Sequence, residues 1–198
     1  GADLRYNLNI DLLDAFTGKK IDLTVPTTEG CDRCDGSGAE PGTKPETCKT
    51  CGGAGQVRMT QGFFSVSRPC PTCNGAGKTI SKPCTKCHGD GVVATNKKVS
   101  VTIPQGVDDG TRLRLAGEGE AGRGGASDGD LFIFLNIRPH PIYKREAQHM
   151  AVELPVDFVT AALGGEITLP TLDGKNLKVK IPEGTQSGDK IRLKQQGM

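Results

Sequence analysis

Alternating apolar and polar residues mark the first and last thirds of the chain. Residues 4–12 alternate strictly, and residues 21–25 alternate again until Pro26, which we expect to stop the run. Because successive side chains of a strand point to opposite faces, such runs predict strands with one buried face. Residues 13–17, ended by Gly18, predict a helical turn between these strands. Three later strands are predicted at residues 99–103, 111–115 and 131–137, the last apolar on both faces and therefore central.

The second part of the chain repeats the first. Residues 152–158 mirror residues 6–12 at an offset of 146 positions, and Ile181-Pro-Glu-Gly184 mirrors Ile103-Pro-Gln-Gly106 at an offset of 78. The two offsets differ by 68 residues, which is the length of an insertion in the first copy. Arg138-Pro-His-Pro141 breaks the chain between the copies, as expected of a domain boundary. The repeat predicts two β domains of one design.

All eight cysteines lie in the insertion, in four copies of the pattern Cys-x-x-Cys-x-Gly-x-Gly that begin at Cys31, Cys48, Cys70 and Cys84. Two residues between the cysteines let one tight turn direct both sulfurs to one ion, and zinc takes four such ligands tetrahedrally. The glycines that follow allow a backbone with positive φ. Four turns therefore predict two zinc ions in closed, structural sites, which leave no open position for a substrate.

The pairing of the turns follows from residues 56–67, where two short alternating runs flank Gly62 and predict a β-hairpin. Such a hairpin would bring the second turn beside the third and leave the first and fourth to pair outside it. The predicted ligands of one ion are Cys31, Cys34, Cys84 and Cys87, and those of the other are Cys48, Cys51, Cys70 and Cys73.

Two alternatives would also use these cysteines. A disulfide framework fits eight cysteines, but the rest of the chain is long and cysteine-free, and no secretory segment is visible. A thiol-disulfide oxidoreductase would require a lowered thiol pKa and a βαβ context, whereas the flanks of these turns favour hairpins. Reduced thiols held on zinc are typical of the cytosol, so we expect a cytoplasmic protein.

Composition and charge limit the classes of partner that the protein is expected to bind. The formal net charge is +2, and eight thiolates with two zinc ions would change it to −2. Nucleic-acid binding needs clustered Lys and Arg, but along residues 29–93 as a whole they are mixed with Asp and Glu. We therefore interpret these charges as a solvated surface and expect no nucleic-acid partner. No apolar run approaches the roughly 18 residues of a membrane span, so no membrane partner is expected either.

Several motifs together resemble bacterial DnaJ, the zinc-containing class of J-domain co-chaperones. They are the four cysteine repeats, the two Ile-Pro-x-Gly blocks, residues 115–122 (Leu-Ala-Gly-Glu-Gly-Glu-Ala-Gly) and residues 161–166 (Ala-Ala-Leu-Gly-Gly-Glu). The resemblance covers the whole chain and implies the same pairing of turns, one with four and two with three. It also implies that the protein binds unfolded client polypeptides, prevents their aggregation and hands them to a DnaK-type chaperone.

The family's client groove is a shallow apolar surface on the first β domain, where a polypeptide adds to a sheet edge. Laying this sequence on the family's strands gives five expected lining residues: Leu4, Leu23, Val25, Val99 and Ile133. The alternative is that these are ordinary core residues, since alternating apolar residues tend to be buried. His88 follows Cys87 and is a further candidate ligand, but four cysteines already satisfy zinc. We interpret His88, His140 and His149 as surface or turn residues.

The chain departs from the family's pattern in what it lacks. The family's J domain carries a His-Pro-Asp motif, whereas the only His-Pro here is His140-Pro141-Ile142. The Gly/Phe-rich linker and the dimerisation segment are also absent, so we expect a homodimer for the full-length protein and a monomer for this fragment. The fragment is expected to bind clients without stimulating the partner's ATPase by itself. No catalytic constellation is visible, and we expect no enzyme.

The predicted fold is mostly β, with two tandem small β-sandwich-like domains and a zinc-binding β-hairpin module inserted in the first. The first domain is expected at residues 1–28 and 94–138, and the module at 29–93. The second domain, at 139–198, is expected to be truncated after a fourth strand near residues 191–193.

Overall fold

The computed structural model describes residues 1–61 and 64–197, which form two compact units. The first unit contains three segments, Gly1–Tyr6, Thr24–Val99 and Arg114–Phe132. The second contains Asn7–Leu23, Ser100–Leu113 and the residues from Ile133 onward. This division into compact units does not follow the expected domain bounds. It does not test the repeat on which those bounds rest, so they stay a prediction. None of the helices in the described residues is both long enough and apolar enough to cross a membrane.

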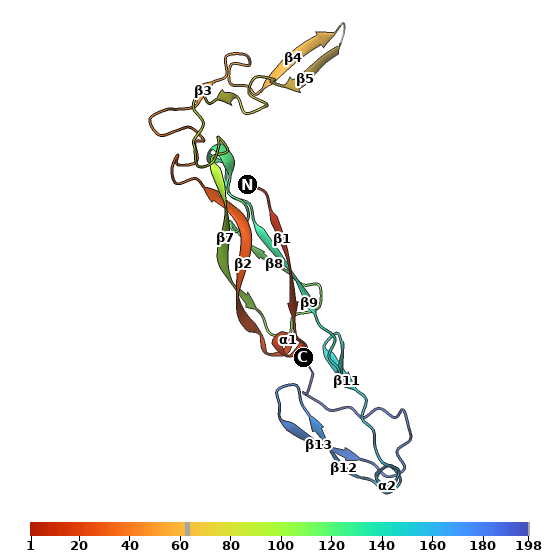
Figure 1. Cartoon of the computed structure of the whole chain (residues 1–198). Coiled ribbons are helices and arrows are strands. Elements are labelled where there is room, and N and C mark those ends of the chain that lie inside the picture. Colours follow the sequence, from red (N-terminus) through yellow and green to blue (C-terminus); the bar gives the residue numbers. More distant parts are fainter. Residues whose placement is uncertain (62–63, 198) are drawn as a thin grey trace. The chain divides into compact units, whose positions relative to one another are not determined.

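Strands dominate the described chain, which confirms the mostly-β class (Figure 1). In the first copy and the insertion the elements are β1 (Leu4–Ile10), α1 (Leu12–Thr17), β2 (Lys19–Gly30), β3 (Glu46–Thr47), β4 (Gln56–Gln61), β5 (Phe64–Pro69), β6 (Lys78–Thr79), β7 (Val92–Ile103), β8 (Arg112–Leu115), the 3-10 helix η1 (Arg123–Gly125) and β9 (Leu131–Ile137). They are followed by β10 (Tyr143–Glu146), β11 (His149–Val152), α2 (Phe158–Leu163), β12 (Gly165–Pro170) and β13 (Asn176–Ile181).

The sheets are small. One sheet has the strand order β1-β9-β8, and the others are the pairs β2-β7, β3-β6, β4-β5, β10-β11 and β12-β13. The central position predicted for residues 131–137 is confirmed, because β9 lies between two strands and Leu131, Ile133 and Leu135 are fully buried.

Several strand predictions were wrong in their extent. The strand expected at residues 99–103 is only the end of β7, which begins at Val92, and the strand expected at residues 4–12 ends at Ile10. Pro26 does not stop the second strand, because β2 continues to Gly30. A proline is tolerated there since an edge strand needs amide donors on one side only. No strand forms at residues 191–193, the counterpart of β8. In the first copy β8 is paired with β9, and residues 191–193 have no such strand beside them in the described chain.

The internal repeat is visible in the backbone of the second unit. Leu12 and Phe158, which are 146 residues apart, each begin a six-residue helix rather than end a strand. Gly18 and Gly164 end these helices with φ of 74° and 77°. A Cβ added to Gly18 would lie 3.0 Å from the carbonyl oxygen of Ile103, and one added to Gly164 would lie 3.2 Å from that of Ile181. The two Ile-Pro-x-Gly blocks therefore pack against equivalent helix ends. A short turn at Asp173-Gly174, with Gly174 at positive φ, connects β12 and β13.

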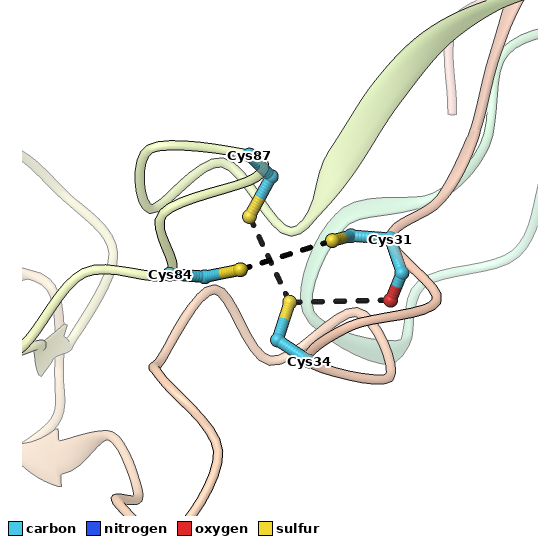
Figure 2. Close-up of side chains that lie close together, drawn as sticks. All are labelled: Cys31, Cys34, Cys84 and Cys87. Carbon is cyan, nitrogen blue, oxygen red and sulfur yellow. Dashed lines mark hydrogen bonds between the residues drawn. The ribbon is translucent and has the colours of Figure 1, made fainter.

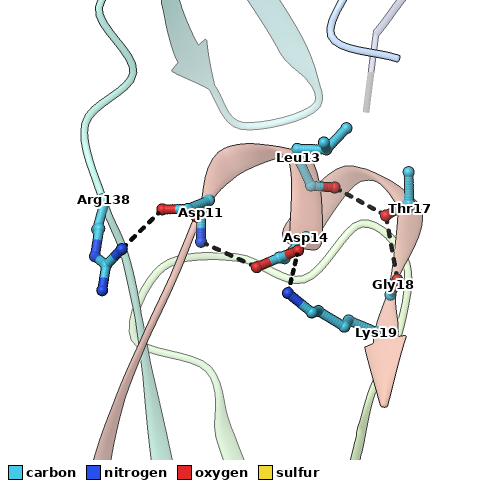
Figure 3. A network of polar contacts seen from close by, with 7 residues as sticks. All are labelled: Asp11, Leu13, Asp14, Thr17, Gly18, Lys19 and Arg138. Carbon is cyan, nitrogen blue, oxygen red and sulfur yellow. Dashed lines mark hydrogen bonds and ion pairs between the residues drawn. The ribbon is translucent and has the colours of Figure 1, made fainter. Parts of the chain in front are cut away.

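Helix α1 is held by both polar contacts and burial (Figure 3). The Asp14 carboxylate accepts hydrogen bonds from the backbone amide of Asp11 (3.5 Å) and the Lys19 ammonium (3.0 Å), while Arg138 pairs with Asp11 (3.2 Å). Pairs this exposed contribute little free energy. Burial contributes more, because Leu12 packs into a cluster of the second unit formed with Tyr143, Leu169, Val179 and Ile181.

Candidate metal centres

The structure brings four sulfurs together from the first and fourth cysteine turns. The Sγ atoms of Cys31, Cys34, Cys84 and Cys87 all lie within 4.8 Å of one another, and Figure 2 shows the four side chains directed at a common centre. The Sγ–Sγ distance is 3.9 Å for Cys31 and Cys84, and 3.7 Å for Cys34 and Cys87. A tetrahedron with Zn–S bonds of about 2.3 Å places its sulfurs about 3.8 Å apart. All four side chains are buried.

The second and third turns form an equivalent group. The Sγ–Sγ distance is 3.8 Å for Cys48 and Cys70, and 3.7 Å for Cys51 and Cys73. Cys51 is half-buried, whereas the other three are buried. All eight cysteines are free thiols, so neither group is a pair of disulfides. The chemistry and spacing of both groups fit a tetrahedral thiolate-binding ion, and the residues in each group are those that the hairpin argument paired.

The hairpin that brings the second and third turns together consists of β4 and β5, drawn side by side in Figure 1. Its predicted turn residue, Gly62, lies outside the described residues. The first and fourth turns are joined instead by the Lys86–Asp32 ion pair at 2.5 Å and by backbone hydrogen bonds from Cys31 to Gly91 and from Cys84 to Gly38. Arg33 pairs with Glu40 within the segment of the first turn. Glu40 also accepts a hydrogen bond from the Thr85 amide at 3.0 Å. The Lys86 hydrogen bond lowers the pKa of Asp32, and the Arg33 hydrogen bond lowers that of Glu40.

Each turn directs a backbone amide at its own second cysteine. The donor is the second glycine of the repeat, and the N–Sγ distances are 3.3 Å for Gly38 to Cys34, Gly55 to Cys51 and Gly77 to Cys73, and 3.2 Å for Gly91 to Cys87. Such donors favour the thiolate, which is the form that binds metal. Burial opposes this in both groups and raises the pKa of Cys34 and Cys73 to about 11. Against the same burial, backbone amides lower the pKa of Cys70 to about 6 and that of Cys87 to about 7.

The two glycines of each repeat have different roles. A Cβ on the second glycine would lie well inside 3.0 Å of a backbone carbonyl in the paired turn: Gly38 against Gly89, Gly55 against Gly75, Gly77 against Gly53, and Gly91 against Gly36. The first glycine is less crowded, and no atom lies within 4 Å of a Cβ built on Gly75. The first glycine is therefore required mainly for its positive φ, whereas the second is also required because two backbones meet there.

Sequence reasoning missed the role of the residue after each second cysteine. Asp35, Gly52, Asn74 and His88 all take positive φ, between 47° and 59°. Asp, Asn, His and Gly are the residue types that tolerate this region best, which is the signal that was available in the sequence. His88 is exposed and is not a member of either sulfur group. Its presence is explained by backbone conformation rather than by ligation.

The expected groove residues are mostly buried. Leu4 is half-buried, whereas Leu23, Val25 and Val99 are buried and Ile133 is fully so. These side chains do not form an exposed apolar patch, and the groove stays a prediction. Among the described residues, the most exposed large apolar side chains lie elsewhere: Met59, Phe64 and Val66 on the β4–β5 hairpin, and Phe158, Val159 and Leu163 on α2. Alternation in the sequence does not distinguish a face that is covered from one that is not.

Comparison with known proteins was consistent along the whole chain. Residues 4–198 match the family model described as the DnaJ C terminal domain. All 198 residues align with proteins named Chaperone protein DnaJ from Agrobacterium fabrum (56% identical), Sinorhizobium fredii (54%) and Methylorubrum extorquens (50%). The alignments cover 52%, 52% and 51% of these relatives, so the chain spans about half of their length.

Proposed function

This chain belongs to the DnaJ C-terminal domain family, and from that premise we propose that it is the client-binding part of a chaperone. It binds unfolded or non-native polypeptides, prevents their aggregation and hands them to a DnaK-type chaperone. The observation that carries the proposal is the alignment of the entire chain, at 50–56% identity, with bacterial proteins named Chaperone protein DnaJ. The action belongs in the cytoplasm, where thiols stay reduced, and no enzymatic reaction is part of it.

The proposal includes one zinc ion in each sulfur group. Cys31, Cys34, Cys84 and Cys87 hold one, and Cys48, Cys51, Cys70 and Cys73 hold the other. It is supported by the eight free thiols, by sulfur separations of 3.7–3.9 Å and by the glycine amides directed at the sulfurs. Each zinc ion would link two turns that share few apolar contacts, so we expect folding of the module to depend on metal.

Client docking on the first β domain is proposed at the edge of a sheet. β1 is the outer strand of the sheet β1-β9-β8, and an outer strand offers unpaired backbone groups to an extended polypeptide. Leu4 is half-buried on β1 and is the expected groove residue best placed to contact a client. Leu23, Val25, Val99 and Ile133, the other expected groove residues, are buried and would act as core residues. The dimer expected of the full-length protein remains part of the proposal, with this stretch alone as a monomer.

The test is fluorescence anisotropy of a labelled, permanently unfolded polypeptide titrated with the zinc-loaded chain. We expect binding that changes little between low and high salt, weakens in Leu4→Ser and is unaffected in Asn7→Ser, a control on the opposite face of β1. The same variants are compared in an assay of client aggregation, and light scattering reports the oligomeric state. Absence of binding, or affinity that falls steeply with salt, would overturn the proposal.

A further inference from the structure

The β4–β5 hairpin has an apolar face that nothing covers in the described chain. Met59 is paired with Val66, and Val57 with Arg68. Paired residues and those two positions along share a face of an antiparallel ribbon, so these four side chains and Phe64 lie on one face. Val57, at the base, packs against the second sulfur group. Further out the face is open, with Met59, Phe64 and Val66 exposed by 49%, 78% and 50%.

The opposite face of the hairpin is polar. Arg58 is paired with Ser67 and Thr60 with Ser65, and the Ser67 hydroxyl donates to the Gln56 side chain at 2.7 Å. The hairpin is therefore amphipathic, which is the pattern of a ribbon whose apolar face is normally covered by another surface. Two strands form the entire sheet, so both outer edges also have unpaired backbone groups among the described residues. An apolar patch next to an open edge is typical of a surface that binds an extended chain.

The charges around the hairpin indicate which kind of extended polypeptide would bind there. Residues 47–89 contain six basic residues and no Asp or Glu: Lys49, Arg58, Arg68, Lys78, Lys82 and Lys86. Charges are mixed across residues 29–93 as a whole, but the acidic residues of that range all lie outside residues 47–89. Lys86 is paired with Asp32, whereas no carboxylate of the described residues forms an ion pair with the other five. Arg68 ends the apolar face and is free to pair with a carboxylate from outside.

We propose that the face formed by Met59, Phe64, Val66 and Arg68 binds an extended polypeptide segment in which an acidic residue is followed by apolar residues two and four positions later. The inference rests on the proposed polypeptide binding and adds a second, charge-selective surface to it. The segment adds antiparallel to the outer edge of β5. The residue opposite Arg68 then precedes, by two and four positions, those beside Val66 and Phe64. Its carboxylate pairs with the guanidinium while the apolar side chains cover the ring and the valine.

The order of residues makes this inference specific. An added strand presents alternate side chains to one face, so the acidic and apolar residues must keep a spacing of two. Reversing the order would place the carboxylate beside Phe64 and an apolar side chain beside Arg68. Replacing the acidic residue by Lys would place two cations together. Both changes should weaken binding through the same contact.

The experiment uses the zinc-loaded chain and labelled peptides with the order acidic-x-Leu-x-Leu, the reversed order, and Lys in place of the acidic residue. We expect the first peptide to bind about fivefold more tightly than the others. Arg68→Glu should invert the preference between the acidic and Lys peptides, and Phe64→Ser should weaken the acidic peptide about tenfold. Ser65→Ala, on the polar face, is the matched control. Zinc content and an NMR spectrum of each variant show that the module is folded.

Two results would overturn the inference. One is equal affinity for all three peptides, or affinity unchanged in Arg68→Glu and Phe64→Ser. The other is tight binding of a single-stranded oligonucleotide that the acidic peptide does not displace, since a basic surface with an exposed ring also suits nucleic acid. If the unfolded polypeptide still binds at β1 in either case, the proposed function stands and only the second surface fails. If no polypeptide binds at all, both fail together.

Discussion

Replacing Gly77 by alanine should weaken the second metal centre far more than replacing Gly75 in the same turn. Both glycines have positive φ, 71° for Gly77 and 93° for Gly75, so each substitution places a Cβ in a region that costs about 1–2 kcal/mol. The difference lies in the surroundings. At Gly77 the Cβ would lie well inside 3.0 Å of the Gly53 carbonyl oxygen, whereas at Gly75 no atom lies within 4 Å.

The obstruction at Gly77 is backbone of the paired turn and cannot rotate away. Relief requires the second and third turns to separate, and overpacking of this kind costs about 1–3 kcal/mol. The total expected for Gly77→Ala is therefore about 3 kcal/mol, against about 1 kcal/mol for Gly75→Ala. Separation also moves Cys73, whose sulfur accepts a hydrogen bond from the Gly77 amide at 3.3 Å. Because metal binding and closure of the two turns are coupled, the cost appears as lost zinc affinity.

The assay is competition for zinc between the chain and a coloured chelator. Gly77→Ala should lower the affinity of the second centre roughly 100-fold and Gly75→Ala about fivefold. The first centre, which neither substitution touches, serves as the internal reference. Cobalt in place of zinc reports the ligand geometry through its absorption spectrum. Equal effects of the two substitutions would refute the reasoning that the second glycine is required for space.

Three further outcomes are expected. A chelator should remove metal in a fast phase from the second centre, since one of its cysteines is half-buried, and in a slow phase from the first centre. Cys84→Ser, which removes a ligand of the first centre, should abolish only the slow phase. Loss of the fast phase in this variant would contradict the assignment. Hydrogen bonding to Lys175 lowers the pKa of Asp173 to about 2, so its stabilising contribution is present above the ordinary carboxyl pKa and is lost as pH falls through about 2. NMR titration should show that low midpoint, and a midpoint at the ordinary value would exclude the contact. Leu12→Ala should cost about 3 kcal/mol in urea unfolding because Leu12 is 3% exposed, against less than about 1 kcal/mol for Leu13→Ala at 41% exposure. Equal costs would show that the cluster around Leu12 is not a core.

Local patterns accounted for much of the fold. Strict alternation located β1, and the doubly apolar run located the central strand β9. The offset repeat agrees with the equivalent surroundings that the structure gives to Gly18 and Gly164. Predictions failed where a partner strand decides the outcome. β2 passes through Pro26 because pairing with β7 needs amide donors on one side only, and residues 191–193 have no strand beside them in the described chain.

The sequence by itself determined the two groups of four sulfurs and the family, because ligand spacing, turn residues and repeated motifs are local patterns that can be recognised without the tertiary structure. Only the tertiary structure decided which apolar residues are covered. Ile133 and Phe64 are both apolar residues in segments that the sequence predicts to be strands, yet one is fully buried and the other is 78% exposed. It also decided which glycines meet a paired backbone, and that no carboxylate of the described residues forms an ion pair with Arg68. Burial and close approach depend on segments distant in the chain, and alternation in one segment carries no information about them.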